Sequence, residues 1–219
     1  LMGFSKPQRG STVIDGKDSW EYSAELQRNI GYLPGEIALP TGMTGTQFLV
    51  MQKKMRGLTD TSYLGKLLER FELDPNIGLK QMSLGTKRKL AVVTAFMHDP
   101  KILILDEPTA GLDPKGRDDI LNCLKYLREE TGMTIILVSH SMDDVANYVS
   151  RIMVMNDGVL TYDDTPRNVF RHYKELEEIG LAAPQVTYLM NDLKQAGFDV
   201  NTDAITIDEA KESILSALG

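Results

Sequence analysis

The sequence contains very little cysteine and no long hydrophobic run. Cys123 is the only cysteine among the 219 residues, so no disulfide can form within the chain. This usage is typical of a reducing compartment, the cytoplasm, and we expect Cys123 to be a small buried residue of a helix. The longest aliphatic stretches, around 102–105 and 134–138, are far shorter than the roughly 20 residues of a membrane helix. We therefore predict no membrane-spanning segment.

Positive charge is also scarce. The chain has 24 Lys and Arg against 31 Asp and Glu, a formal net charge of −7, and an isoelectric point near 5.0. This balance disfavours a nucleic-acid backbone or an anionic lipid surface as the main partner. Attachment to a membrane would therefore have to go through other proteins.

The hydrophobic pattern is typical of an α/β fold. Two β-prone runs flank a turn at Asp15-Gly16, and a long stretch with helical periodicity follows. Short aliphatic strands then alternate with helices, which predicts a parallel sheet with crossover helices. The runs are 11–14 and 29–33, the helical stretch is 43–97, the strands are 101–106, 134–138 and 151–155, and the helices are 114–130 and 141–149. A helical subdomain at about 41–100 is thus inserted into the α/β frame.

From residue 166 onward the pattern changes to helices separated by polar joints. Thr206 and Glu209 have the spacing of a capping box at the start of the last helix. Two apolar stripes follow helical periodicity, and they require packing on the core, on each other or on a partner. The stripes consist of Val186, Leu189, Met190 and Leu193, and of Ile207, Ile214, Leu215 and Leu218. We interpret 171–219 as an appended helical region.

Two acids directly follow the aliphatic strand that ends at Leu105. The carboxyl end of a strand in a parallel sheet opens onto the ligand crevice, so Asp106 and Glu107 are expected beside bound phosphates. Asp106 is suited to hold Mg²⁺, and Glu107 to polarise an attacking water. An acidic turn after a buried strand is the plain alternative.

The segment Ser83-Leu84-Gly85-Thr86 is followed by a basic, helix-forming run. It resembles the LSGGQ signature of ATP-binding cassettes, with Leu84 in place of a glycine and Thr86 in place of the glutamine. A hydroxyl, small residues and a helix amino end together allow a phosphate to approach backbone N–H groups. A serine-capped helix without a ligand is the alternative.

Further motifs of the same family follow in order. Leu112-Asp113 resembles the D-loop, and Ser139-His140 resembles the switch histidine, although a lone histidine after a strand is more often structural. The resemblance covers about three-quarters of the chain.

The resemblance implies a P-loop NTPase-type cassette, and with it both cofactors and site roles. The cofactors are ATP and Mg²⁺. The catalytic residues are Glu107 and His140, with His140 at the γ-phosphate, and Asp106 is the magnesium ligand. The residues that contact nucleotide, in part that of a facing cassette, are Ser83, Gly85, Thr86 and Asp113.

The resemblance also implies a division into domains and a set of partners. Residues 1–170 correspond to a truncated nucleotide-binding domain and 171–219 to a C-terminal extension. The family acts as head-to-tail dimers of identical or different ATPase subunits, bound to transmembrane transporter subunits at the inner face of the cell membrane. The expected reaction is ATP hydrolysis coupled to transport.

The sequence departs from the family pattern at two places. No segment has the form GxxxxGK[ST] of the phosphate-binding loop: neither Gly16-Lys17 nor Gly65-Lys66 satisfies it. We expect the chain to begin after that loop, with 1–4 as the end of a helix, and to be inactive alone. The second departure is Gly35, which stands where the family has its Q-loop glutamine, with Glu36 as the alternative.

Two family types are represented in the sequence. Residues 30–57 resemble drug- and polymer-exporter cassettes. The segment from Pro114 onward, particularly 165–169 and 173–187, resembles the second ATPase of energy-coupling-factor importers, which take up vitamins or metal ions. A joined or engineered sequence remains open. So do three other functions: an exporter ATPase, a non-hydrolysing regulatory cassette, and a cassette ATPase of translation or repair.

Overall fold

The computed structural model describes residues 2–60 and 62–219, which divide into two compact units, Leu1–Val138 and Ser139–Gly219. The first unit contains β1 (Val13–Ile14), β2 (Lys17–Asp18), α1 (Ser23–Leu26), β3 (Ile30–Leu33), α2 (Gly45–Arg56), α3 (Ser62–Arg70), α4 (Leu84–Phe96), β4 (Ile102–Asp106), α5 (Pro114–Thr131) and β5 (Thr134–Val138). The second contains α6 (Met142–Tyr148), β6 (Ile152–Asn156), β7 (Val159–Asp164), α7 (Pro166–Phe170), α8 (Tyr173–Glu178), α9 (Gln185–Gln195) and α10 (Ile207–Leu218). These units are packing units, and the functional boundary at residue 170 stays a prediction.

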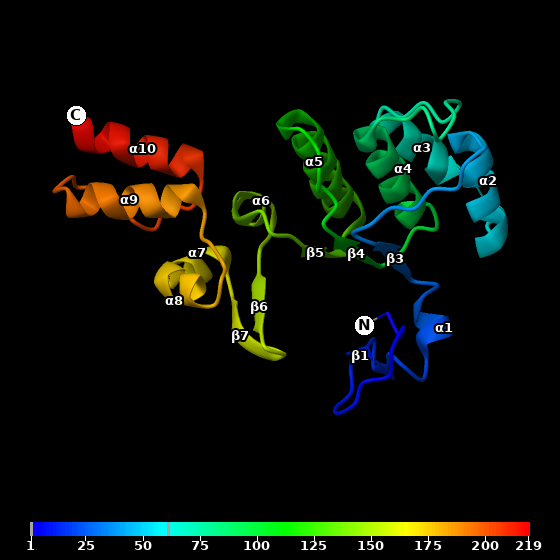
Figure 1. The fold of residues 1–219 in the computed structure, drawn as a ribbon, viewed down its shortest axis with the longest axis horizontal. Coiled ribbons are helices and arrows are strands. Elements are labelled where there is room, and N and C mark those ends of the chain that lie inside the picture. Colours follow the sequence, from blue (N-terminus) through cyan, green and yellow to red (C-terminus); the bar gives the residue numbers. More distant parts are fainter. Residues whose placement is uncertain (1, 61) are drawn as a thin grey trace. The chain divides into compact units, whose positions relative to one another are not determined.

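The first unit is built on a three-stranded parallel sheet in the order β3-β4-β5 (Figure 1). The middle strand, β4, is almost continuously aliphatic because both of its faces are covered, and Leu103 and Leu105 are fully buried. The prediction of a parallel sheet with crossover helices is therefore confirmed for 101–106 and 134–138. It is wrong for 151–155, which pairs antiparallel as β6 with β7 in a separate hairpin.

Helices α2, α3 and α4 connect β3 to β4, as the change of periodicity predicts. Helix α2 begins with a reciprocal capping box between Thr44 and Gln47, and ends at Gly57 in the left-handed conformation. Helix α4 lies so close to β3 that a Cβ on Gly31 would be 2.3 Å from the Ala95 carbonyl oxygen. The absence of a side chain at Gly31 thus sets the distance between helix and sheet.

The N-terminal residues form a small hairpin. Strands β1 and β2 pair antiparallel around Asp15 (φ 50°) and Gly16 (φ 76°), which confirms the predicted turn. The expectation of a helix end at 1–4 is wrong for Met2 to Phe4, which are not helical, and Leu1 lies outside the described residues. So short a segment cannot close helical hydrogen bonds by itself.

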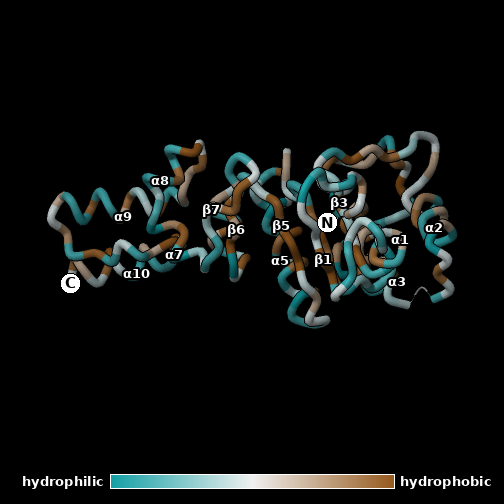
Figure 2. Tube along the Cα trace, turned by 90° about the horizontal axis from the view of Figure 1, so that it is seen from below, coloured by the Kyte–Doolittle hydropathy of each residue, from teal (hydrophilic) through white to brown (hydrophobic). Residues whose placement is uncertain are grey.

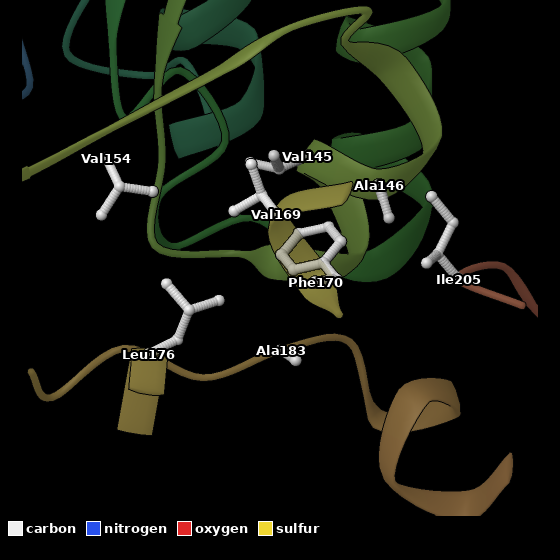
Figure 3. Packing of buried hydrophobic residues seen from close by; sticks show 8 residues of the cluster. All are labelled: Val145, Ala146, Val154, Val169, Phe170, Leu176, Ala183 and Ile205. Carbon is white, nitrogen blue, oxygen red and sulfur yellow. The ribbon is translucent and has the colours of Figure 1, made fainter. Parts of the chain in front are cut away.

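The second unit is organised around the β6–β7 hairpin and helices α6, α7 and α8. The hairpin turns at Asp157 and Gly158, both at positive φ. Figure 3 shows the buried side chains of one cluster in this unit, gathered around Phe170. The cluster consists of Val145, Ala146, Val154, Val169, Phe170, Leu176, Ala183 and Ile205.

Helices α9 and α10 pack on each other, and their residues alternate between hydrophilic and hydrophobic in Figure 2. The buried members of this second cluster are Val186, Met190, Val200, Ala204 and Ala210. The predicted stripes are therefore only partly used, because Leu189, Ile207, Leu215 and Leu218 remain exposed.

Two arginines, Arg167 of α7 and Arg171 at its C-cap, bind the α9–α10 connection and the start of α10. Arg171 donates two hydrogen bonds to the carboxylate of Asp203, at 2.8 and 2.6 Å. Arg167 donates to Glu209 at 2.6 Å. The Arg171 pair lowers the pKa of Asp203.

The predicted capping box of α10 forms only in part. Thr206 accepts a hydrogen bond from the Glu209 N–H at 3.4 Å, as predicted. The Glu209 carboxylate accepts instead from the Ile205 N–H, at 2.9 Å. The Glu209 carboxylate also accepts from Arg167, so it is bound by a tertiary contact and not by the Thr206 N–H.

Cys123 is less buried than expected. It lies in α5 but is only partly buried, and its thiol donates to the Arg70 carbonyl oxygen at 3.7 Å. Burial raises the pKa of this thiol, which keeps it protonated at neutral pH. Across residues 2–60 and 62–219, no helix combines the length and apolar character needed to cross a bilayer.

Candidate nucleotide and metal site

The acidic pair lies where the sequence predicts it, at the carboxyl end of β4. Asp106 is in register with Val138 of β5, and Glu107 leaves the strand with φ 45°, in the left-handed region. The Glu107 N–H donates to the Val138 carbonyl oxygen at 2.9 Å, which anchors this turn to β5. A left-handed non-glycine residue costs roughly 1–3 kcal/mol, and such strain is common at functional sites. Both residues are partly exposed, although one carboxylate oxygen of Glu107, Oε1, is buried.

Gly35 lies directly against Asp106. A Cβ on Gly35 would be 3.3 Å from Oδ2 of Asp106, closer than most side chains approach. The loop after β3 therefore limits where this carboxylate can lie. A glutamine at position 35, as in the family pattern, would have to displace it, while Glu36 is exposed.

Arg88 is a residue of this site that sequence reasoning missed. It lies in α4 and is 6% exposed, although it belongs to the basic run Lys87-Arg88-Lys89. Burial lowers the pKa of its guanidinium, and the carboxylates of Glu107 and Asp106 oppose that shift. Helical spacing could have predicted that Arg88 is buried, since it lies four residues before the buried Val92 and shares its face of the helix.

The signature residues form the start of α4. Ser83 is the N-cap: its Oγ accepts from the Thr86 N–H at 3.1 Å and lies 2.8 Å from the Thr86 hydroxyl. Ser83 therefore caps the helix, and its contact with a nucleotide stays a prediction. Ser83 is exposed, and Gly85 and Thr86 are partly exposed, so the amino end of the helix is accessible to a phosphate.

The D-loop residues lie beside the signature. A Cβ on Gly111 would be 2.9 Å from Cδ2 of Leu84, and a Cβ on Gly85 would be 3.8 Å from Cδ2 of Leu112. Asp113 itself caps α5, where its carboxylate accepts from the Gly116 N–H at 2.8 Å. The structure therefore brings the two motifs together and gives Asp113 a helix-capping role.

His140 belongs to the second unit, in the exposed turn before α6. The neighbouring Ser139 hydroxyl accepts from the Ser141 N–H at 3.0 Å, which shapes this turn. The assignment of His140 to the γ-phosphate stays a prediction.

The acidic pair has the chemistry that Mg²⁺ requires. Asp106 and Glu107 offer hard carboxylate oxygens, and Mg²⁺ in nucleotide sites is commonly held by one or two carboxylates together with phosphates and water. No cluster of three or more His, Cys, Asp or Glu placed to hold a metal occurs in the described part of the chain. The assignment of Asp106 as the magnesium ligand stays a prediction.

Comparison with known proteins identifies the family. Residues 16–143 match the family model described as "AAA domain, putative AbiEii toxin, Type IV TA system". The energy-coupling factor transporter ATP-binding protein EcfA2 of Caldanaerobacter subterraneus is 49% identical over 234 residues, covering 100% of this chain and 80% of that protein. The chain belongs to the energy-coupling factor ATP-binding protein family. The alignment includes the segment that resembles exporter cassettes.

Other members and solved structures of ATP-binding cassettes are also similar. The energy-coupling factor protein EcfA2 of Clostridium perfringens is 50% identical over 137 residues, covering 63% of this chain. That match spans 48% of the relative, about half its length. The structure of cbiO1 from Clostridium perfringens, described as part of the ABC transporter complex cbiONQ, superimposes with a TM-score of 0.67 at 26% identity, covering 86% of this chain and 79% of that one. This energy-coupling factor family member therefore has the ATP-binding cassette fold.

Proposed function

We propose that this chain is the hydrolytic part of an ATPase subunit that powers an importer of the energy-coupling factor type. The observation that carries the proposal is the acidic pair at the carboxyl end of β4, with Glu107 in the left-handed region. That edge of a parallel sheet is where phosphates bind, and a rigid strand holds both carboxylates in place. Membership of the energy-coupling factor family supports import of a vitamin or metal ion.

Each site residue has a distinct part in the proposed reaction. Mg²⁺, when bound, neutralises charge on the β- and γ-phosphates. Asp106 would hold the cation, and Glu107 would orient the attacking water and accept its proton. His140 would donate a hydrogen bond to the γ-phosphate.

The signature residues would serve a second nucleotide. The amino end of α4, with Ser83, Gly85 and Thr86, would direct N–H groups at the phosphates bound to a facing cassette. Asp113 would maintain the D-loop next to that interface. The partners would be a second ATPase subunit and transmembrane subunits at the cytoplasmic face of the membrane, in line with the transporter complex to which cbiO1 belongs.

A non-hydrolysing regulatory cassette is the second candidate. Leu84 and Thr86 alter the signature, and Gly35 occupies the glutamine position. These differences would weaken water positioning and leave binding as the main activity.

The 219-residue polypeptide alone is expected to bind ATP only weakly. It contains no GxxxxGK[ST] segment, so the nest of N–H groups and the lysine that cradle the β- and γ-phosphates are missing from it. Isothermal titration calorimetry should show no micromolar site. A form extended at its N-terminus by a strand and such a loop should bind in that range and hydrolyse ATP. If the extended form binds without turnover, the regulatory cassette replaces the ATPase proposal.

The exposed residues of α10 are expected to contribute to pairing between subunits. Leu215 is 58% and Leu218 is 68% exposed, so Leu215→Lys with Leu218→Lys should change the melting temperature little. Size-exclusion chromatography should show weaker dimerisation. Glu212→Lys, an exposed change on the same helix, is the control for charge. A lower melting temperature with intact pairing would mean that these side chains only cover the chain's own core.

A further inference from the structure

Helices α4 and α5 contact each other near their amino ends. Lys89, in the second turn of α4, pairs with Asp119 of α5 at 3.3 Å. Each helix begins at its own cap, Ser83 for α4 and Asp113 for α5. The segment that resembles the signature and the segment that resembles the D-loop therefore meet at one end of this helix pair.

Leu84, the first residue of α4, packs on the D-loop. Its Cδ2 lies 2.9 Å from the position that a Cβ on Gly111 would take, so it fills the space of a side chain there. Leu112 makes the converse contact, since its Cδ2 lies 3.8 Å from where a Cβ on Gly85 would stand. Gly111 is at φ 74°, a conformation that costs glycine little. Each leucine is thus packed on a glycine of the other segment.

The loop that Leu84 contacts begins at Glu107. Two turn hydrogen bonds stiffen this loop. The Ala110 N–H donates to the Glu107 carbonyl oxygen at 3.1 Å, and the Leu112 N–H donates to the Thr109 carbonyl oxygen at 3.2 Å. A shift at the start of α4 therefore reaches the proposed base through a short, hydrogen-bonded path.

We propose that Leu84 is a positioning residue, which fixes the loop after Glu107 against the signature segment. The glycine that the family pattern has at this position could not make the contact, because it has no side chain. Movement of α4 when Ser83 meets the facing cassette's nucleotide would then be passed to Glu107. This inference rests on the proposed function in taking Glu107 as the base and Ser83 as a contact of the second nucleotide.

Amide hydrogen exchange of the 219-residue chain, followed by mass spectrometry, tests the contact without ATP. Leu84 is 49% exposed, so Leu84→Ala loses about half the burial of a leucine and should speed exchange in 107–113 about fivefold. Leu112→Ala should likewise speed exchange in 83–88. Leu84→Met, which has a similar volume, should keep exchange slow. Val50→Ala removes a side chain of α2 that is 46% exposed, and this control should leave both segments unchanged.

A form extended with a phosphate-binding loop tests the positioning role. Leu84→Ala should lower kcat about tenfold and leave KM for ATP within about twofold, because a loosened loop misplaces Glu107 while the phosphate-binding groups stay in place. Leu84→Met should recover most of the rate. Unchanged exchange in 107–113, or unchanged kcat in a form that hydrolyses ATP, would overturn the inference. If the extended form has no turnover, the proposed function fails, and the exchange result still decides whether Leu84 fixes the loop.

Discussion

Replacing Glu107 by Gln is expected to lower ATP hydrolysis by about 10²–10⁴-fold in a form extended with a phosphate-binding loop. Glutamine keeps the size and much of the hydrogen bonding of glutamate, but it cannot accept the proton of the attacking water. ATP binding should persist, because the phosphates are held by other groups. Steady-state phosphate release and calorimetry on the same preparation measure the two quantities.

The control for this substitution is Glu129→Gln, at an exposed position of α5. It removes the same charge far from any proposed role, so turnover should stay unchanged. Asp106→Asn provides a second comparison, since loss of the cation ligand should weaken the dependence on Mg²⁺ as well as the rate. Unchanged hydrolysis by the Glu107 variant would remove this residue from its assigned role.

Of the substitutions that add one methyl group to the first unit, Gly31→Ala is expected to be the most destabilising. The added Cβ would lie 2.3 Å from the Ala95 carbonyl oxygen and 2.8 Å from Cδ1 of Leu103. Because the first of these atoms is backbone, helix α4 must move away from β3. Overpacking of this kind costs roughly 3 kcal/mol. The melting temperature should fall by about 5–10 °C.

Gly65→Ala is the matched control. Gly65 is exposed within α3, and no atom lies within 4 Å of a Cβ built there. Alanine favours the helix over glycine by roughly 0.5–1 kcal/mol, so this variant should be slightly more stable. Equal melting temperatures for the two variants would show that β3 and α4 are not in close contact.

The Gly31 variant also affects the candidate site. Helix α4 carries Ser83 at its start and Arg88 within it, so moving the helix should change the signature and the buried cation together. Arg88→Met alters the charge and leaves the backbone in place. Comparing the two variants separates the effect of moving helix α4 from the effect of removing the charge of Arg88.

The sequence was most informative where the structural signal is local. Hydrophobic periodicity predicted the aliphatic strand that ends at Asp106, and turn residues predicted the turn at Asp15-Gly16. Helix caps were also readable, since Ser83 and Thr206 act on N–H groups only three residues away. Such interactions depend on neighbouring residues, so they can be inferred without the fold.

The sequence by itself determined the α/β class, the order of the motifs and the acidic pair, because each depends on residues close together in the chain. Only the tertiary structure decided that Gly35 faces Asp106, that Arg88 is buried and that Glu209 contacts Arg167. These contacts join residues far apart in sequence. Their partners depend on how helices and strands pack, and charge or periodicity alone cannot specify that packing.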